Sequence, residues 1–255
     1  NPYFSHKQWL ESPVTFTWQG QDQNDIPYDG DYTYAYYLID KAGNVSETVT
    51  GNVRYDQNAP VISAHNDLSQ RVFSPNGDGR LDHLVYDFTF SEAVTVNYTL
   101  IDGSGTPLKT WPAIAAAVTE NQLVLDAAFF TPDDPQQAIS DGTYQVRIEV
   151  VDSLDNRAAV TVNVQLDITP PQLTPMAGWT FSNAISQIDY VYDASEFLTL
   201  QWGWEYATAS RNIPQGEGRI NLTPMTNTSG TFEGWMRYRD VAQNETTHNM
   251  TVTLD

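Results

Sequence analysis

Oxygen-bearing side chains alternate along residues 76–82, a spacing suited to binding a cation. Asn76, Asp78 and Asp82 offer amide and carboxylate oxygens, and the glycines between them permit a tight turn. Ca²⁺ takes about six to eight oxygen ligands from loops of this kind. The loop lacks the distant bidentate glutamate of a complete EF-hand, and Asn-Gly-Asp-Gly is also a favourable turn without an ion. The sequence predicts a Ca²⁺ site at these three residues, with a plain turn as the alternative.

Two further acids, Asp56 and Asp167, each stand between an alternating strand pattern and a proline-containing segment. Pro60 follows Asp56, and Pro170 follows Asp167. Each acid is a candidate Ca²⁺ ligand that would stiffen the chain at that point. The alternative is an aspartate that only caps a turn, which is the more common role of this residue type.

Nucleophilic and metal catalysis find little support in the residue pattern. The chain has no cysteine, no Gly-x-Ser-x-Gly elbow, no His-x-x-x-His zinc pair and no phosphate-binding loop with a lysine. Carboxylates are so numerous that spacing alone does not exclude a glycosidase pair, but they concentrate at predicted turns. We therefore expect no catalytic residues and no bound cofactor other than Ca²⁺. The histidines, which serve none of these motifs, are His6, His65, His83 and His248.

A row of large apolar side chains alternates along residues 198–206 and ends in Trp202, Trp204 and Tyr206. Exposed aromatic rings of this kind can stack on sugars. An alternating apolar row is more often the buried face of a strand, so we expect it to form core.

One pattern occurs three times, from Gly30 to Asn44, Gly142 to Asn156 and Gly230 to Asn244. In each copy an aromatic residue stands two positions after the glycine, an aspartate eight positions later, and an asparagine four positions after that. Alternating residues on both sides of the Asp-x-x-x-Asn segment predict a β-hairpin with a side-chain-capped turn. The second strands are expected over residues 45–53, 158–166 and 248–254. Residues 113–118 are expected to form a loop.

The spacing of these hairpins divides the chain into three predicted modules. They are a partial or small module at residues 1–57, a full one at 58–168 and another at 169–255. Short strands with turns every 8–12 residues, in units of roughly 85–110 residues, are typical of immunoglobulin-like sandwiches. We predict an all-β fold of tandem immunoglobulin- or fibronectin-III-like β-sandwich domains. Because the chain starts inside a repeat, we expect it to be a piece of a larger protein.

The formal net charge is −20, from 32 acidic and 12 basic side chains. Such a surface repels nucleic-acid phosphates and anionic lipid headgroups, and it attracts hydrated cations. No apolar run reaches the length needed to span a bilayer. We therefore exclude nucleic acid as a partner and expect no membrane insertion.

Residues 73–82 read Phe-Ser-Pro-Asn-Gly-Asp-Gly-Arg-Leu-Asp, and Asp141-Gly142-Thr143-Tyr144 closes the same predicted module. This arrangement resembles the Fn3-like domains that follow the catalytic domain in cell-envelope subtilisin-like proteases of the C5a peptidase family. It is also similar to the Ig-like domain of the flagellar hook-capping protein. Residues 17–30 resemble the C-terminal half of the same module, and residues 172–255 share only the final hairpin. The resemblance implies a bacterial cell-surface or secreted location.

Together these features predict a non-catalytic spacer, scaffold or substrate-positioning region, and the resemblance points to a subtilisin-like protease as its neighbour. The expected partners are adjacent domains of the same parent chain. The alternative is an adhesin-type module that binds a host or cell-surface protein or glycan.

Overall fold

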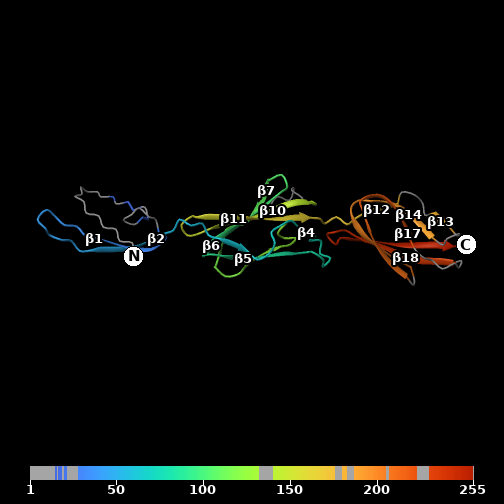
Figure 1. Ribbon diagram of the computed structural model, residues 1–255, viewed down its shortest axis with the longest axis horizontal. Coiled ribbons are helices and arrows are strands. Elements are labelled where there is room, and N and C mark those ends of the chain that lie inside the picture. The colour runs from blue at the N-terminus through green and yellow to red at the C-terminus, as the bar shows by residue number, and fades with distance from the viewer. Residues whose placement is uncertain are drawn as a thin grey trace.

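The computed structural model describes residues 15, 17, 18, 20, 21, 28–131, 140–175, 180–182, 187–204, 207–222 and 230–254. Every regular element in these ranges is a β-strand, and the strands form five separate sheets. The three predicted modules follow one another along the long axis of the molecule (Figure 1). No sheet draws strands from two of the three predicted modules. The predicted all-β fold of tandem immunoglobulin- or fibronectin-III-like sandwiches is confirmed, while module boundaries at residues 58 and 169 stay a prediction.

In the first module, a single hairpin is described. Strand β1 (Gly30–Tyr36) pairs antiparallel with β2 (Val49–Tyr55), and an isolated bridge joins Ile39 to Val45. The second strand therefore starts later than predicted, because only this bridge pairs the residues just after the turn. The Trp18 ring packs edge-on against Tyr32, with ring centroids 4.6 Å apart.

The second module is a sandwich of two sheets. The larger sheet has the order β4 (Arg71–Phe73), β11 (Arg157–Leu166), β10 (Gly142–Val151), β6 (Val94–Ile101) and β7 (Pro107–Thr110), with β8 (Ile114–Ala116) also paired to β6. The smaller sheet has the order β3 (Ile62–Ala64), β5 (Leu84–Phe90) and β9 (Asn121–Leu125). The strand β8 replaces the loop predicted over residues 113–118, since Ala115 and its neighbours find a pairing partner in β6.

Strict alternation builds the core of this sandwich. Every second residue of β5 is buried, and Tyr144, Val146, Ile148 and Val150 of β10 are buried as predicted. Because successive side chains of a strand point to opposite faces, one face of each sheet meets the other while its second face meets water. These residues belong to one contiguous apolar cluster.

The third module repeats the two-sheet arrangement. One sheet contains β12 (Leu173–Pro175), β14 (Gln187–Ala194), β13 (Thr180–Ser182) and β17 (Gly216–Leu222), which pairs with β14. The other has the order β16 (Ala207–Ile213), β15 (Leu198–Trp204), β18 (Gly230–Arg239) and β19 (Glu245–Leu254). The residues Leu198, Leu200, Trp202 and Trp204 are all buried, so the predicted aromatic row is core. Tyr206, the last residue of that row, lies outside the described residues.

The three predicted hairpins are β1–β2, β10–β11 and β18–β19, and they lie in three different sheets. Within the described ranges there is no helix with the length and apolar character needed to cross a membrane.

Candidate metal centre

The Asp-x-x-x-Asn turn is the element from which the candidate site is built. In β10–β11, one Asp152 carboxylate oxygen accepts hydrogen bonds from the backbone N–H groups of Leu154 and Asn156, at 2.7 and 2.9 Å. Its other oxygen accepts one from the Asn156 side-chain amide, at 2.8 Å. Asp240 and Asn244 repeat the bonds between aspartate and asparagine in the third module, and Asp40 and Asn44 do so in the first. The aspartate and the asparagine therefore hold each other in one fixed geometry.

The residue before the asparagine has a left-handed backbone in all three turns. It is Gly43 in the first turn, Asp155 in the second and Gln243 in the third, with φ values of 91°, 71° and 71°. Left-handed backbone is easiest for glycine and tolerated by a few polar residues. The sequence pattern predicted the side-chain-capped turn, and the structure locates its left-handed position.

The asparagines of the second and third turns also reach the junction that precedes their module. The Asn156 side-chain amide donates to the Asp56 carbonyl oxygen at 3.2 Å, and that of Asn244 donates to the Asp167 carbonyl oxygen at 2.9 Å. These bonds fix each junction aspartate beside the aspartate of the turn. Asp56 and Asp167 are thus equivalent positions in space as well as in sequence.

A glutamate from the same module completes each group. Glu92 follows Ser91, whose backbone N–H and side-chain oxygen both bond to the backbone of Val61, at 3.1 and 2.9 Å. Glu196 follows Ser195, which makes the same two bonds to Gln172, at 3.0 and 2.9 Å. This shared anchoring places each glutamate beside the first residues of its module, and therefore next to the junction.

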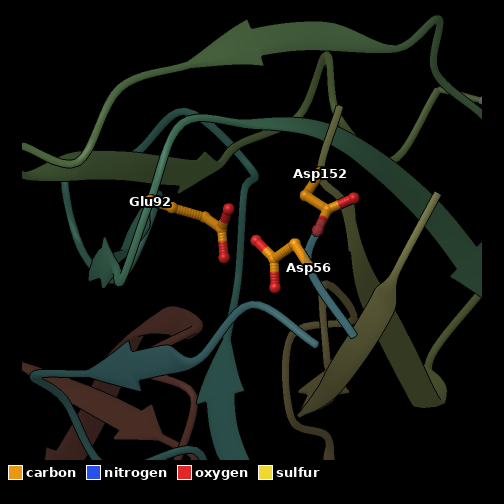
Figure 2. Close-up of side chains that lie close together, drawn as sticks. All are labelled: Asp56, Glu92 and Asp152. Atoms are coloured by element: carbon orange, nitrogen blue, oxygen red, sulfur yellow. The ribbon is translucent and has the colours of Figure 1, made fainter. Parts of the chain in front are cut away.

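Two clusters of three carboxylates result, one at each junction. The first cluster is Asp56, Glu92 and Asp152, and its three side chains point toward one another (Figure 2). The second cluster is Asp167, Glu196 and Asp240. Within each cluster one oxygen from every residue lies within 4.8 Å of the others. Asp152 and Asp240 are 8% and 4% exposed, so these acids are not ordinary surface carboxylates.

In the second cluster, burial raises the pKa values of all three acids, and neighbouring carboxylates add to this effect at Asp167 and Glu196. Burial, then the charges of Asp240 and Asp141, raises the pKa of Asp167 to about 6. Burial, then the charges of Asp167 and Asp240, raises the pKa of Glu196 to about 7. Burial also raises the pKa of Asp240, against the opposing hydrogen bonds from Asn244.

In the first cluster the pKa shifts of two acids have opposite directions, raised for Glu92 and lowered for Asp152. The pKa of Glu92 is raised, mainly by burial and then by the negative charges of Asp56 and Asp152. Burial acts to raise the pKa of Asp152 too, but hydrogen bonds from Asn156 and Leu154 outweigh it and lower that pKa. An Arg54 nitrogen lies 3.6 Å from an Asp56 oxygen and supplies positive charge beside the first cluster.

The donor chemistry of both clusters fits a hard divalent cation. Three carboxylates provide up to six oxygens, and neither cluster contains nitrogen or sulfur ligands. Oxygen-only sites of this kind favour Ca²⁺, which tolerates irregular geometry, over zinc or copper. A bound cation would also relieve the like-charge repulsion that raises the pKa values of the second cluster.

In the loop at residues 76–82, side-chain oxygens accept hydrogen bonds from backbone N–H groups of the loop itself. Both carboxylate oxygens of Asp82 accept backbone hydrogen bonds, from Gly77 at 2.8 Å and from Gly79 at 2.7 Å. Asn76 accepts one from the Asp78 N–H, and Asp78 accepts one from the Arg80 N–H. These residues therefore form a self-capped turn, and a Ca²⁺ site at Asn76, Asp78 and Asp82 stays a prediction.

Sequence reasoning identified the junction acids but not their partners. The repeated pattern identifies Asp152 and Asp240 only as turn caps, and it does not include Glu92 or Glu196. A Ser-Glu pair before a strand, present in both modules, was the one signal available for the glutamates.

No protein-family model matches this chain, and no curated protein sequence matches it. The chain is similar in structure to a tetra-tandem repeat in the extending region of a large adhesion protein, with 16% identity over 90% of this chain and 57% of that one, at a TM-score of 0.33. It is also similar to a Ca²⁺-stabilised, ice-binding adhesin of an Antarctic bacterium, with 15% identity over 88% of this chain and 56% of that one, at a TM-score of 0.34.

A third similar structure contains the FN1–FN3 domains of chicken CNTN1, with 10% identity over 87% of this chain and 76% of that one, at a TM-score of 0.36. The chain spans little more than half the length of these two solved adhesin chains. At these identities and TM-scores the likeness concerns the general fold, and it carries no argument about function.

Proposed function

We propose that this chain is a non-catalytic tandem β-sandwich region of a secreted or surface-exposed bacterial protein, and that it acts as a spacer whose module junctions are stiffened by Ca²⁺. The observation that carries the proposal is the recurrence of one carboxylate cluster at two junctions. Each cluster joins an acid from the junction to two acids of the module that follows. A cation bound there would couple the junction to that module, which is what a stiff spacer requires.

The placement of the clusters supports a mechanical role for the metal. Each junction is a short segment that connects separate sheets, and such segments are the natural hinges of a multidomain chain. Asp29 and Asp141, in the modules before the two junctions, each accept a hydrogen bond from a junction backbone N–H, at 3.0 and 2.7 Å. The junction is thus held from both sides, and a cation would add the strongest of these restraints.

The neighbour that this spacer positions is proposed to be a subtilisin-like surface protease, on the basis of the resemblance at residues 73–82. A role as a protein- or glycan-binding adhesin module is the second candidate. The half-exposed side chains of Tyr34 and Tyr36 on β1 favour it, because exposed aromatic rings are common in binding surfaces. A glycan array and a protein-binding screen on the intact chain separate the two roles.

Titration calorimetry with CaCl₂ and X-ray scattering on the intact chain test the proposal. We expect Ca²⁺ binding at both junctions and a longer, stiffer particle in Ca²⁺ than in chelator. The double variant Glu92→Gln/Glu196→Gln should lose both effects. The matched control is Glu120→Gln, because Glu120 is an exposed acid outside both clusters. Identical scattering in Ca²⁺ and in EGTA would refute the spacer mechanism.

A further inference from the structure

The second junction contains a polar contact between modules that needs no metal. Ser74 of the second module and Asn244 of the third are both fully buried, at 0% exposure, although both lie outside the strands. The Asn244 side-chain oxygen accepts hydrogen bonds from the Ser74 hydroxyl and from the Asn76 amide, the latter at 2.7 Å. Its side-chain nitrogen donates to Asp167 and Asp240. Asn244 therefore joins the second module, the junction and the third module.

Charged and backbone contacts extend this interface. Arg80 of the second module lies 2.9 Å from a carboxylate oxygen of Glu245 in the third. Glu245 is also paired with Arg237 and Arg239 of β18, so its position is determined within its own module. Within the third module, the Thr246 hydroxyl donates to the Pro171 carbonyl oxygen at 3.0 Å and fixes the turn to the segment just after the junction.

The segment that makes these contacts is preformed. The self-capped turn of residues 76–82 needs left-handed backbone at Gly77 and Gly79, with φ values of 83° and 85°. Asp82 holds the N–H groups of both glycines, so Asn76 and Arg80 are presented from a rigid turn. A preformed surface loses little conformational entropy when it docks.

We propose that the loop at residues 74–82 is a metal-independent latch for the third module, and that its partner is the Asp240–Glu245 turn. Opening the second junction would break both hydrogen bonds to the Asn244 oxygen and the Arg80–Glu245 ion pair together, and none of these contacts includes a cation. The latch therefore keeps the second junction closed after the cation is removed. This goes beyond the proposed Ca²⁺-dependent spacer, in which the cation is the stiffening element.

The first junction lacks an equivalent latch in the described part of the chain. Asn156 bonds to Asp152 and to the Asp56 carbonyl, and Arg157 pairs with Glu149 and Asp155 of its own module. No described side chain of the first module bonds to either residue. The two junctions should therefore respond differently to chelation.

Distance measurements by pulsed electron spin resonance on the intact chain test the latch. The chain has no cysteine, so introduced pairs can be labelled without interference. Val118→Cys with Arg211→Cys reports on the second junction, and Thr50→Cys with Val118→Cys reports on the first; all three positions are exposed.

In EGTA we expect the 118–211 distance distribution to stay as narrow as in Ca²⁺, while the 50–118 distribution broadens. The double substitution Ser74→Ala/Arg80→Ala should broaden the 118–211 distribution in EGTA. Arg147→Ala, an exposed arginine paired within the second module, is the matched control and should have no effect. Circular dichroism verifies that each variant is folded.

Two results would contradict the latch. One is a 118–211 distance distribution that broadens in EGTA in the unsubstituted protein. The other is a distribution that stays equally narrow in EGTA when Ser74 and Arg80 are both replaced by alanine. Failure of the spacer mechanism is a different result, since the 50–118 distribution would then be the same in Ca²⁺ and EGTA. Should the double variant fail to fold, Arg80→Ala alone supplies the second test. It removes the ion pair with Glu245 and leaves the junction bonds of Asn244 in place, and it should broaden the same distribution.

Discussion

The side-chain amide of Asn244 donates a 2.9 Å hydrogen bond to the backbone carbonyl oxygen of Asp167, so the last hairpin turn of the third module is fixed to the junction that precedes it. Asn156 and Asp56 repeat this relationship one module earlier. The bond explains why two acids far apart in sequence share a cluster. The asparagine that caps a turn also brings the junction aspartate to the turn aspartate.

Calcium should raise the thermal stability of the chain. A ligand that binds only the folded state at one hundred times its dissociation constant stabilises it by about 2.7 kcal/mol. For a module of this size that corresponds to a rise in Tm of roughly 10 °C or more. Differential scanning calorimetry in CaCl₂ and in EGTA measures it, with MgCl₂ as a comparison. Equal melting temperatures in CaCl₂ and EGTA would argue against both junction sites.

Neutralising one glutamate should have opposite effects with and without the cation. At pH 8 and in EGTA, Glu196→Gln should raise the stability of the third module, because it removes a half-buried negative charge that repels Asp167 and Asp240. In CaCl₂ the same variant should be less stable than the unsubstituted protein, because a ligand is lost. Urea denaturation in both buffers measures the reversal. If Glu196→Gln changes the free energy of unfolding in the same direction in both buffers, Glu196 is not a metal ligand.

Without cation, the third module should lose stability as pH rises from about 5 to 8. The pKa of Asp167 is raised to about 6 and that of Glu196 to about 7. In the unfolded chain the pKa values of Asp and Glu are about 3.9 and about 4.3. The folded state therefore binds more protons across this window, and stability falls as these protons are released.

Melting curves at several pH values in EGTA measure the slope of stability against pH, which should be negative between about pH 5 and 8. In CaCl₂ the slope should flatten or reverse, since the cation favours the ionised carboxylates. Glu196→Gln should reduce the slope in EGTA. A stability that is independent of pH between 5 and 8 in EGTA would show that the carboxylates do not repel one another as the structure indicates.

The three turn asparagines should differ in importance. Asn244 is fully buried and bonds to the junction and the second module in addition to its own turn, while the described bonds of Asn156 reach its own turn and the junction. Asn44 is exposed and bonds only to its own turn. Removing a buried hydrogen-bonding group costs about 1–3 kcal/mol. We expect Asn244→Ala to cost most, Asn156→Ala less and Asn44→Ala least, as measured by urea denaturation. Equal losses at the three sites would mean that only the local turn matters.

The aromatic row of β15 should contribute to stability and not to ligand binding. Trp202 and Trp204 are 5% and 8% exposed and belong to the core of the third module. Trp202→Ala should cost about 3–5 kcal/mol, as a large buried side chain does when truncated. Phe197, half exposed beside the same strand, is the control position, and Phe197→Ala should cost far less. A glycan-binding defect in folded Trp202→Ala would contradict this assignment.

Local patterns were sufficient to predict the strands and turns of the three repeated hairpins. The alternation of Tyr144, Val146, Ile148 and Val150 depends only on the two-residue period of a strand, so their burial could be predicted without coordinates. The short strand β8 was missed because its apolar residues have no alternating pattern, and only pairing with β6 determines their conformation.

The sequence by itself determined the all-β fold, the repeated hairpin with its Asp-x-x-x-Asn turn, and the acidic character of the junctions, because each depends on residues close together in the chain. Only the tertiary structure decided which acids meet. Glu92 lies 36 positions after Asp56 and Asp152 lies 96 positions after it, by residue number, and no local rule relates such separations. Sheet packing and the asparagine bridges bring these carboxylates together, and the same long-range packing turns the glycine-rich loop into a contact for Asn244.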